Sequence, residues 1–139
     1  MKKGPDAHRP PLRVFVLDRE ASSLAVRGDR KIIAWLDLAA RGEAVVVTSP
    51  MTLVDAYDGR ITEQRWDWVL SRLKVADIGK DEARQARRLL ADAKLHGHKY
   101  AIDAGLAVVA RRQQGRATVF IPDVDDLEKL VLDTVVKKV

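Results

Sequence analysis

The 139-residue chain contains no cysteine and few aromatic residues, which make up only 5% of it. Without cysteine, a disulfide framework, a cysteine-ligated zinc site, an iron–sulfur cluster and a thiol nucleophile are all excluded. The glycine patterns of dinucleotide and P-loop phosphate sites, G-x-G-x-x-G and G-x-x-x-x-G-K-[ST], are also absent. The same holds for the G-x-S-x-G elbow of serine hydrolases. These absences exclude several common classes of enzyme.

Long hydrophobic runs are missing as well. The longest strictly apolar segments, such as Ala44–Val47 and Leu106–Ala110, are far shorter than the roughly 20 residues of a membrane-spanning helix. The first residues, MKKGPDAHRPP, are basic but lack the apolar segment and small-residue cleavage site of a signal peptide. We therefore expect a soluble cytoplasmic protein with no membrane partner.

The net charge of +5 is confined to the two ends of the chain. Residues 1–13 carry +3 and residues 137–138 carry +2, so the segment between them is neutral. We expect residues 1–12, which include three prolines, to form a flexible basic tail. Residues 13–139 are long enough for one domain with its own core. Basic ends attract phosphate groups but occur in many unrelated proteins, so charge alone leaves nucleic-acid binding open.

Short apolar segments rich in β-branched residues alternate with helical patterns along the chain. Strands are predicted at Arg13–Leu17, Ala44–Thr48 and Ala117–Ile121, with weaker ones at Lys74–Ile78 and Thr134–Lys138. Helices are predicted at Ser22–Arg27, Arg30–Arg41, Met51–Tyr57, Glu63–Ser71, Gly79–Leu95, Lys99–Gln113 and Val124–Leu132. This alternation is typical of a three-layer α/β/α fold around a central parallel sheet of four to five strands.

Capping residues mark several of the predicted helix ends. Asp29 is expected to cap the helix that begins at Arg30, and Ser49 followed by Pro50 predicts a helix start after the second strand. Gly42 and Gly97 are expected to end the helices that precede them.

Acidic residues follow the predicted strands, where an open parallel sheet places its functional crevice. Asp18 comes directly after the first strand, and Asp123 follows the 117–121 strand closely, with Asp126 just behind. Asp55 lies in the helix after the second strand. Each has a structural alternative, as a turn residue, an N-cap or a solvated helix residue.

Asp103 is the strongest candidate because it is the only charged residue in YAIDAGLAVVA, residues 100–110. A helix that is apolar on nearly every side is expected to be buried. An ionised carboxylate buried there without partners costs on the order of several kcal/mol or has a raised pKa. A cation, a cluster of donors or a water-filled cleft would compensate; a salt bridge to Lys99 is the structural alternative. Gly105 is consistent with close packing beside this acid.

If the first strand and the 117–121 strand are neighbours, Asp18, Asp55, Asp103 and Asp123 converge on one crevice. Four carboxylates at close range repel one another, and a hard divalent cation, Mg²⁺ or Mn²⁺, is their natural complement. Such a metal can activate water and stabilise charge on a phosphodiester. The arrangement therefore predicts metal-dependent hydrolysis of phosphodiester bonds.

Basic residues near the start of the Asp103 helix are candidates for contacts with the phosphate groups of a substrate. His98 and Lys99 lie there, and helix N-termini and cations both attract phosphate. The further candidates are Arg111, Arg112 and Arg116. A solvated charged face is expected instead for Arg84, Arg87 and Arg88.

With these residues in this order, the sequence resembles the PIN domains, particularly the VapC-type toxin ribonucleases of bacterial toxin–antitoxin pairs. The resemblance covers about residues 13–132 and includes the segments HGHKYAIDAGLA and TVFIPDVDDL. It implies a Rossmann-like PIN fold, RNA cleavage that depends on Mg²⁺ or Mn²⁺, frequent homodimers, and inhibition by a small cognate antitoxin. By position, the family's acidic quartet is matched by Asp18, Asp55, Asp103 and Asp123, with Asp126 as a fifth acid.

The resemblance assigns a role to each of these residues. Asp18, Asp103 and Asp123 would bind the metal, with Asp126 as a further ligand. Asp55 would help to orient water or a second metal ion. His98 and Lys99 would hold the RNA backbone.

The sequence departs from the family pattern at three places. Asp55 stands where the family usually has Glu, and Arg19 stands where a small hydroxyl residue usually follows the first Asp. Ile121 and Pro122 stand where Thr or Ser usually precedes the fourth acid. These changes keep the carboxylates but alter the residues that would orient them. The alternative hypothesis is therefore a degenerate PIN-type protein that binds RNA or a partner protein without cutting.

A DNA-binding helix-turn-helix made of residues 79–95 and 99–113 is a third hypothesis. Its recognition helix would be almost wholly apolar, whereas reading bases requires exposed polar side chains. The sequence therefore disfavours this hypothesis.

Overall fold

The computed structural model describes residues 13–113, 116–121 and 135–138 of the chain. The predicted tail, the predicted helix Val124–Leu132, and the two acids Asp123 and Asp126 lie outside these ranges. Within the described ranges, no helix has both the length and the apolar character needed to cross a membrane.

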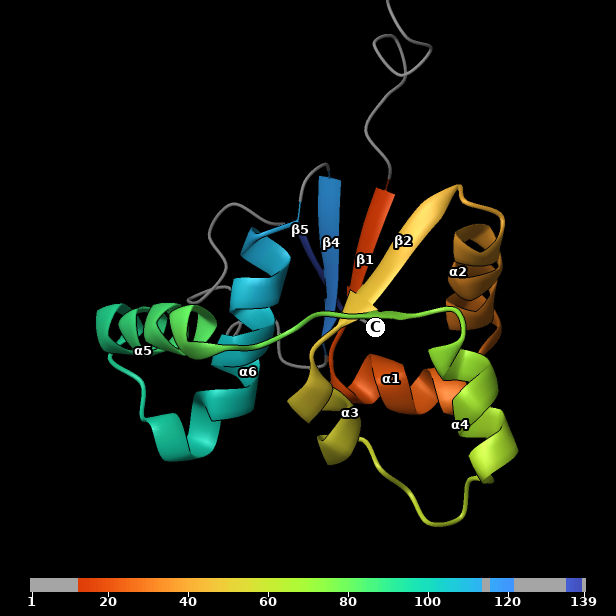
Figure 1. Cartoon of the computed structure of the whole chain (residues 1–139), viewed down its shortest axis with the longest axis horizontal. Coiled ribbons are helices and arrows are strands. Elements are labelled where there is room, and N and C mark those ends of the chain that lie inside the picture. The colour runs from red at the N-terminus through yellow and green to blue at the C-terminus, as the bar shows by residue number, and fades with distance from the viewer. Residues whose placement is uncertain (1–12, 114–115, 122–134, 139) are drawn as a thin grey trace, which may run out of the picture.

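Parallel strands form a central sheet with the order β3-β2-β1-β4-β5 (Figure 1). Their bounds are β1 Arg13–Leu17, β2 Ala44–Thr48, β3 Lys74–Val75, β4 Arg116–Ile121 and β5 Val135–Lys138. β1 pairs with β2 on one side and with β4 on the other, where Leu17 lies opposite Phe120. The expected neighbourhood of the first strand and the 117–121 strand is therefore confirmed. The strand order reverses between β1 and β4, which is the switch point where open parallel sheets bind ligands.

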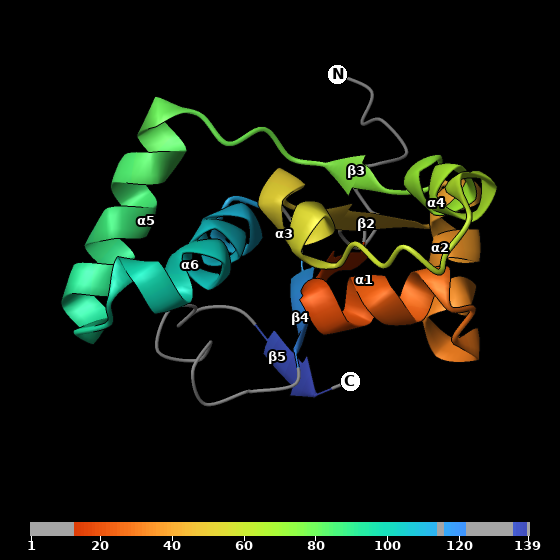
Figure 2. The same ribbon diagram turned by 90° about the horizontal axis from the view of Figure 1, so that it is seen from below.

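Helices cover both faces of the sheet, which confirms the α/β class (Figures 1 and 2). Their bounds are α1 Arg19–Val26, α2 Arg30–Ala40, α3 Pro50–Asp55, α4 Glu63–Leu70, α5 Lys80–Ala93 and α6 Gly97–Arg111. Side chains alternate along β1, so Val14 and Val16 pack with α5 and α6. Phe15 and Leu17 point to the other face and pack with α1, α2 and α4. The sheet thus separates two hydrophobic clusters.

The helix caps predicted at Asp29, Ser49 and Gly42 are confirmed. Asp29 accepts hydrogen bonds from two backbone N–H groups in the first turn of α2, at 3.0 and 3.1 Å. Ser49 accepts one from the N–H of Thr52 at 3.2 Å. Gly42 follows the end of α2 with a φ of +74°, as a C-terminal glycine does.

Several element boundaries differ from the predictions. α1 begins at Arg19 rather than Ser22, because Asp18 itself caps the helix. α5 ends at Ala93, and Lys94 takes the left-handed cap conformation expected of Gly97, with φ 57° and ψ 43°. Gly97 instead begins α6. The third strand is only Lys74–Val75, because the Asp and Gly residues that follow disfavour strand structure.

Lys94→Gly is expected to stabilise the protein by roughly 0.5–1 kcal/mol, because glycine adopts the left-handed conformation without a Cβ clash. Ala93→Gly, one residue earlier in the last turn of α5, is the matched control and should destabilise by about 1 kcal/mol. Urea titrations measure both free energies of unfolding. A lower stability of Lys94→Gly would contradict the expected gain.

Candidate functional site

Asp18 lies at the carboxyl end of β1, beside the switch point of the sheet. Its Oδ1 accepts a hydrogen bond from the N–H of Ala21 at 2.8 Å and so caps α1. Only 6% of the residue is exposed. The N-cap function explains why an Asp stands here. It does not explain the burial, because aspartates are almost never fully buried unless they are paired.

Burial raises the pKa of Asp18 to about 7. The N–H of Ala21 opposes this rise because it binds the charged form, whereas the negative charges of Asp103 and Glu20 add to it. Arg19 lowers the pKa slightly. A buried acid that titrates near neutrality at the edge of a parallel sheet is typical of functional sites.

Asp103 comes to the same edge from α6. This helix packs on the sheet through Ala104 and Ala107, which are fully buried, and its amino-terminal half lies at the carboxyl ends of the strands (Figure 1). Asp103 is half-buried, and its charge acts on Asp18. The structure thus brings together the two acids that the sequence singled out on a strand end and on an apolar helix.

The interpretation of Gly105 as a close-packing residue beside Asp103 is wrong. A Cβ placed on Gly105 would find no other packing partner among the described residues within 4 Å. Two residues also span about 200° around a helix, so Gly105 lies nearly opposite Asp103. The helix is held at the sheet by its alanines instead.

Asp55 is the last residue of α3 and is exposed. Its Oδ2 lies 3.5 Å from Nε of Arg19, the residue directly after Asp18, and both side chains are about half exposed. An ion pair exposed to this degree contributes little to stability. The pair nevertheless brings the cation of Arg19 to Asp55, the carboxylate that the sequence predicts to orient water or a second metal ion.

Buried hydroxyl groups join the carboxyl ends of β1 and β2. Oγ1 of Thr48, a fully buried residue, donates to the carbonyl of Leu17 at 2.7 Å. Ser49 and Thr52 share a second hydrogen bond at 2.6 Å. One turn after Asp18, Oγ of the buried Ser22 has no partner among the described residues. The sequence predicted Ser49 as a helix cap but not the buried contacts of the other hydroxyl groups, although hydroxyl residues at the end of an apolar strand were a visible signal.

His98 and Lys99 lie in the first turn of α6 and are exposed. Nζ of Lys99 lies 5.2 Å from the ring centre of Tyr100, within cation–π distance. Both residues stand about one turn before Asp103, on the same edge of the sheet. They are accessible to a ligand there, and their role in binding substrate stays a prediction.

The other predicted basic residues of α6 lie elsewhere. Arg111 and Arg112 stand at the far end of the helix, and Arg112 lines a pocket with Val14, near the amino end of β1. The chain reverses direction between a strand and the helix beside it, so the two ends of α6 lie at opposite edges of the sheet. Arg111 and Arg112 are therefore not next to the acids.

Two of the four predicted metal ligands lie in the described part of the chain. Among the residues that the structure covers, no group of three or more acidic or histidine side chains could hold an ion. Two of the predicted ligands, Asp123 and Asp126, fall outside that part of the chain. The remaining pair, Asp18 and Asp103, fits a hard cation, because both are oxygen donors whose mutual repulsion a positive charge would relieve.

Sequence reasoning also missed an apolar groove between α3 and α4. It has a volume of about 420 Å³ and is lined by Leu53, Val54, Tyr57, Glu63, Trp66 and Leu70. Val54 and Tyr57 are 63% and 68% exposed. The signal in the sequence was that the short 50–55 helix carries apolar residues on more than one side. A helix that buries a single face needs them on one side only.

Comparison with known proteins places the fold but not the family. No protein-family model matches the sequence, and no curated protein matches it. A chain in the crystal structure of VapBC2 from Rickettsia felis, bound to a DNA fragment from their promoter, matches with a TM-score of 0.63. The match covers 91% of this chain and 98% of that chain at 15% sequence identity. At this identity the similarity establishes a shared fold.

Asp18→Asn is expected to remove a pH dependence of stability. Without metal, folded Asp18 keeps its proton up to about pH 7, whereas in the unfolded chain an aspartate loses it near pH 4. The folded state therefore binds more protons between these values, and stability falls as the pH rises through this window, by on the order of 4 kcal/mol. Asn can still accept the hydrogen bond of Ala21 but carries no charge.

The measurement is the free energy of unfolding of wild type and variant in the presence of chelator, between about pH 4 and 8. Asp67→Asn, which removes an exposed carboxylate on α4, is the matched control and should keep the wild-type dependence. Equal pH dependence of Asp18→Asn and wild type would contradict the expectation.

Proposed function

We propose that this chain is a PIN-type endoribonuclease that hydrolyses RNA phosphodiester bonds with Mg²⁺ or Mn²⁺, and that it acts in the cytoplasm as the toxin of a type II toxin–antitoxin pair. The observation that carries this proposal is the buried Asp18 at the β1–β4 switch point, whose pKa near neutrality calls for a cation. The fold shared with a VapBC2 chain supports it, since almost the whole of both chains matches.

The roles combine those that the resemblance implies with the positions of the described residues. Asp18 and Asp103 would hold the cation, with Asp123 and Asp126 as further ligands. The bound metal would supply an activated water and stabilise charge on the phosphodiester. The N–H of Ala21 fixes the carboxylate of Asp18, and the packed alanines of α6 fix the backbone that carries Asp103. His98 and Lys99 would hold the RNA backbone at the start of α6.

The proposal includes two protein partners, a second copy of the chain and a small cognate antitoxin. Both follow from the resemblance to VapC-type toxins. The exposed apolar side chains of the α3–α4 groove support a protein partner, because a soluble protein rarely leaves such a surface uncovered without a function.

A second candidate function is a degenerate PIN-type protein that binds RNA or a partner but does not cut. The observation that favours it is the ion pair between Arg19 and Asp55. The pair holds the positive charge of Arg19 beside the acids. This charge would compete with a divalent cation for the same carboxylates. Metal dependence separates the two functions, because a binding protein of this kind would hold RNA equally with and without divalent cations.

Asp103→Asn is expected to reduce cleavage of total RNA by roughly 100-fold or more. It removes one of the two proposed metal ligands that lie in the described part of the chain. Chelator should abolish wild-type cleavage, and added Mg²⁺ or Mn²⁺ should restore it. Asp37→Asn, an exposed acid on α2, is the control for the loss of a charge. Circular dichroism should show the same fold in all three proteins. Equal cleavage by wild type and Asp103→Asn would rule out the nuclease assignment.

Arg19→Ser is expected to increase the affinity for Mn²⁺ severalfold. The substitution removes a positive charge next to Asp18 and frees Asp55 from its ion pair. Calorimetric titration with Mn²⁺ measures the affinity directly. Arg27→Ser, which removes the same charge at the other end of α1, is the matched control and should change little. An unchanged or weaker affinity of Arg19→Ser would show that Arg19 does not compete with the metal.

A further inference from the structure

The positive charge of the folded body is concentrated in one helical hairpin. Residues 80–112, which span α5 and α6, contain eight basic and four acidic residues. Residues 14–79 contain nine basic and ten acidic ones. A body that is neutral as a whole therefore carries a distinct positive region, and it lies on one face of the sheet (Figure 2).

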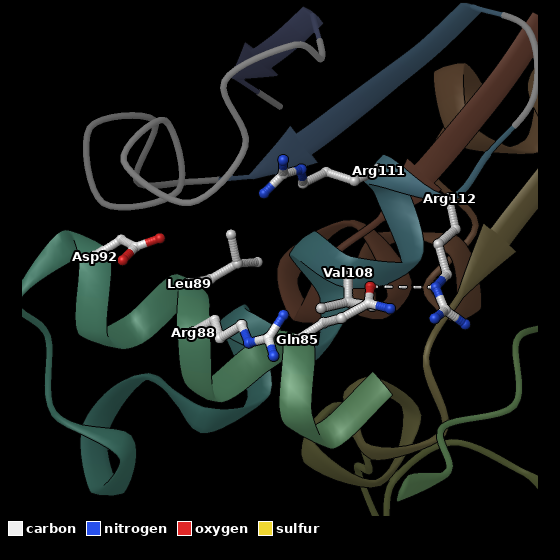
Figure 3. A pocket seen from close by; sticks show the side chains of 7 residues that line it. All are labelled: Gln85, Arg88, Leu89, Asp92, Val108, Arg111 and Arg112. Carbon is white, nitrogen blue, oxygen red and sulfur yellow. Dashed lines mark hydrogen bonds between the residues drawn. The ribbon is translucent and has the colours of Figure 1, made fainter. Parts of the chain in front are cut away.

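A pocket lies in this region, between α5 and α6 (Figure 3). It has a volume of about 380 Å³ and is lined by Gln85, Arg88, Leu89, Asp92, Val108, Arg111 and Arg112. Three of these seven residues are arginines, contributed by both helices and the residue after α6. Val108 is fully buried and, with Leu89, forms an apolar part of the wall.

The three arginines are not equivalent. Arg112 donates to Glu82 and, at 3.3 Å, to Oε1 of Gln85, so its charge is offset and its side chain is fixed. Arg88 and Arg111 are exposed, and neither forms an ion pair with any residue that the structure describes. Asp92 lines the pocket at the end away from Arg112 (Figure 3). Within the described part of the chain, two guanidinium groups at the pocket therefore have no ion-pair partner.

Stability of the fold does not account for both of them. Arg111 lies in the last turn of α6, where the helix dipole favours a cation. Arg88 stands in the middle of α5 and gains nothing from a helix end. Two like charges that line the same pocket repel each other, and the single carboxylate of Asp92 at one end of the pocket can offset at most one of them.

We propose that the pocket lined by Arg88 and Arg111 binds the phosphodiester backbone of a single-stranded nucleic acid. Guanidinium groups bind phosphate through paired N–H donors. The apolar edge that Leu89 contributes to the pocket suits the sugar beside a phosphate. RNA and DNA share this backbone, so the pocket does not distinguish them.

The position of the pocket relates it to the acid pair. Arg111 follows Asp103 by eight residues on the same helix, which is about 12 Å along the axis. At about 3.4 Å per nucleotide of a stacked strand, this spans three to four nucleotides. The inference rests on the proposed function in this respect: an RNA held at the pocket would extend toward Asp18 and Asp103.

Binding of a short fluorescent RNA in the presence of chelator tests the inference, since the metal-dependent cleavage is then silent. The test variant is Arg88→Gln with Arg111→Gln, and the matched control is Arg84→Gln with Arg87→Gln. The control removes the same charge from the same hairpin at residues that do not line the pocket. At low salt the test variant should bind roughly tenfold more weakly than wild type. Its slope of log K against log salt should be smaller by about 1.4, the value for two phosphate contacts of a single strand.

Each other outcome overturns the inference. An equal loss in the control variant would show a diffuse charge effect, and equal binding by the test variant would show that the pocket takes no part. Absence of RNA binding by wild type would do the same. Competition by polyglutamate as effective as that by single-stranded DNA would assign the pocket to an acidic protein. Cleavage with Mn²⁺ is measured separately: a wild type that binds through the pocket but does not cut retains this inference and loses the nuclease function.

Discussion

The rest of the site depends on the burial of the Asp18 carboxylate beside the negative charge of Asp103. A helix cap requires only a side-chain oxygen near the first N–H groups, and most caps provide it at the surface. Here the cap residue is almost completely buried, and one hydrogen bond from Ala21 does not offset the loss of water, so the pKa reaches about 7. The fold thus keeps an acid where it lowers stability at neutral pH, which is the pattern expected when function requires the group.

The surrounding scaffold prevents the two acids from separating. The hydrogen bond from Thr48 to Leu17 ties the end of β2 to the residue just before Asp18. Ala104 and Ala107 let α6 lie directly on the sheet, because small side chains allow close approach. The repulsion between the acids therefore cannot be relaxed by a small movement of one helix. A proton or a bound cation would relieve it instead.

The parts of the fold that local patterns determine could be predicted from the sequence. β1 and β2 have the predicted bounds because continuous β-branched segments leave little choice of conformation. The caps at Asp29 and Ser49 follow from residue chemistry, and the placement of Asp18 near Asp103 follows from the strand order of an α/β fold. The Arg19–Asp55 pair could not be predicted, because it joins two helices whose relative position depends on the whole sheet. The same holds for Lys94, because a lysine there adopts the left-handed conformation that the local preference assigns to glycine.

Helix α6 carries an acid, Asp103, in its amino-terminal half and arginines at its carboxyl end, and this arrangement limits the ligands that suit it. The helix dipole favours the arginine in the last turn by about 0.3–1 kcal/mol, but it does not account for Asp103, which lies beyond the first turn. It accounts for neither the burial of Asp18 nor the position of Arg88, which forms no ion pair with the residues that the structure describes. A simple anion would satisfy the arginines and be repelled by the acids, and a simple cation would do the reverse. Under the proposed function, a phosphodiester chain together with a divalent cation would satisfy both groups, because a bound metal would make the acidic site attract phosphate.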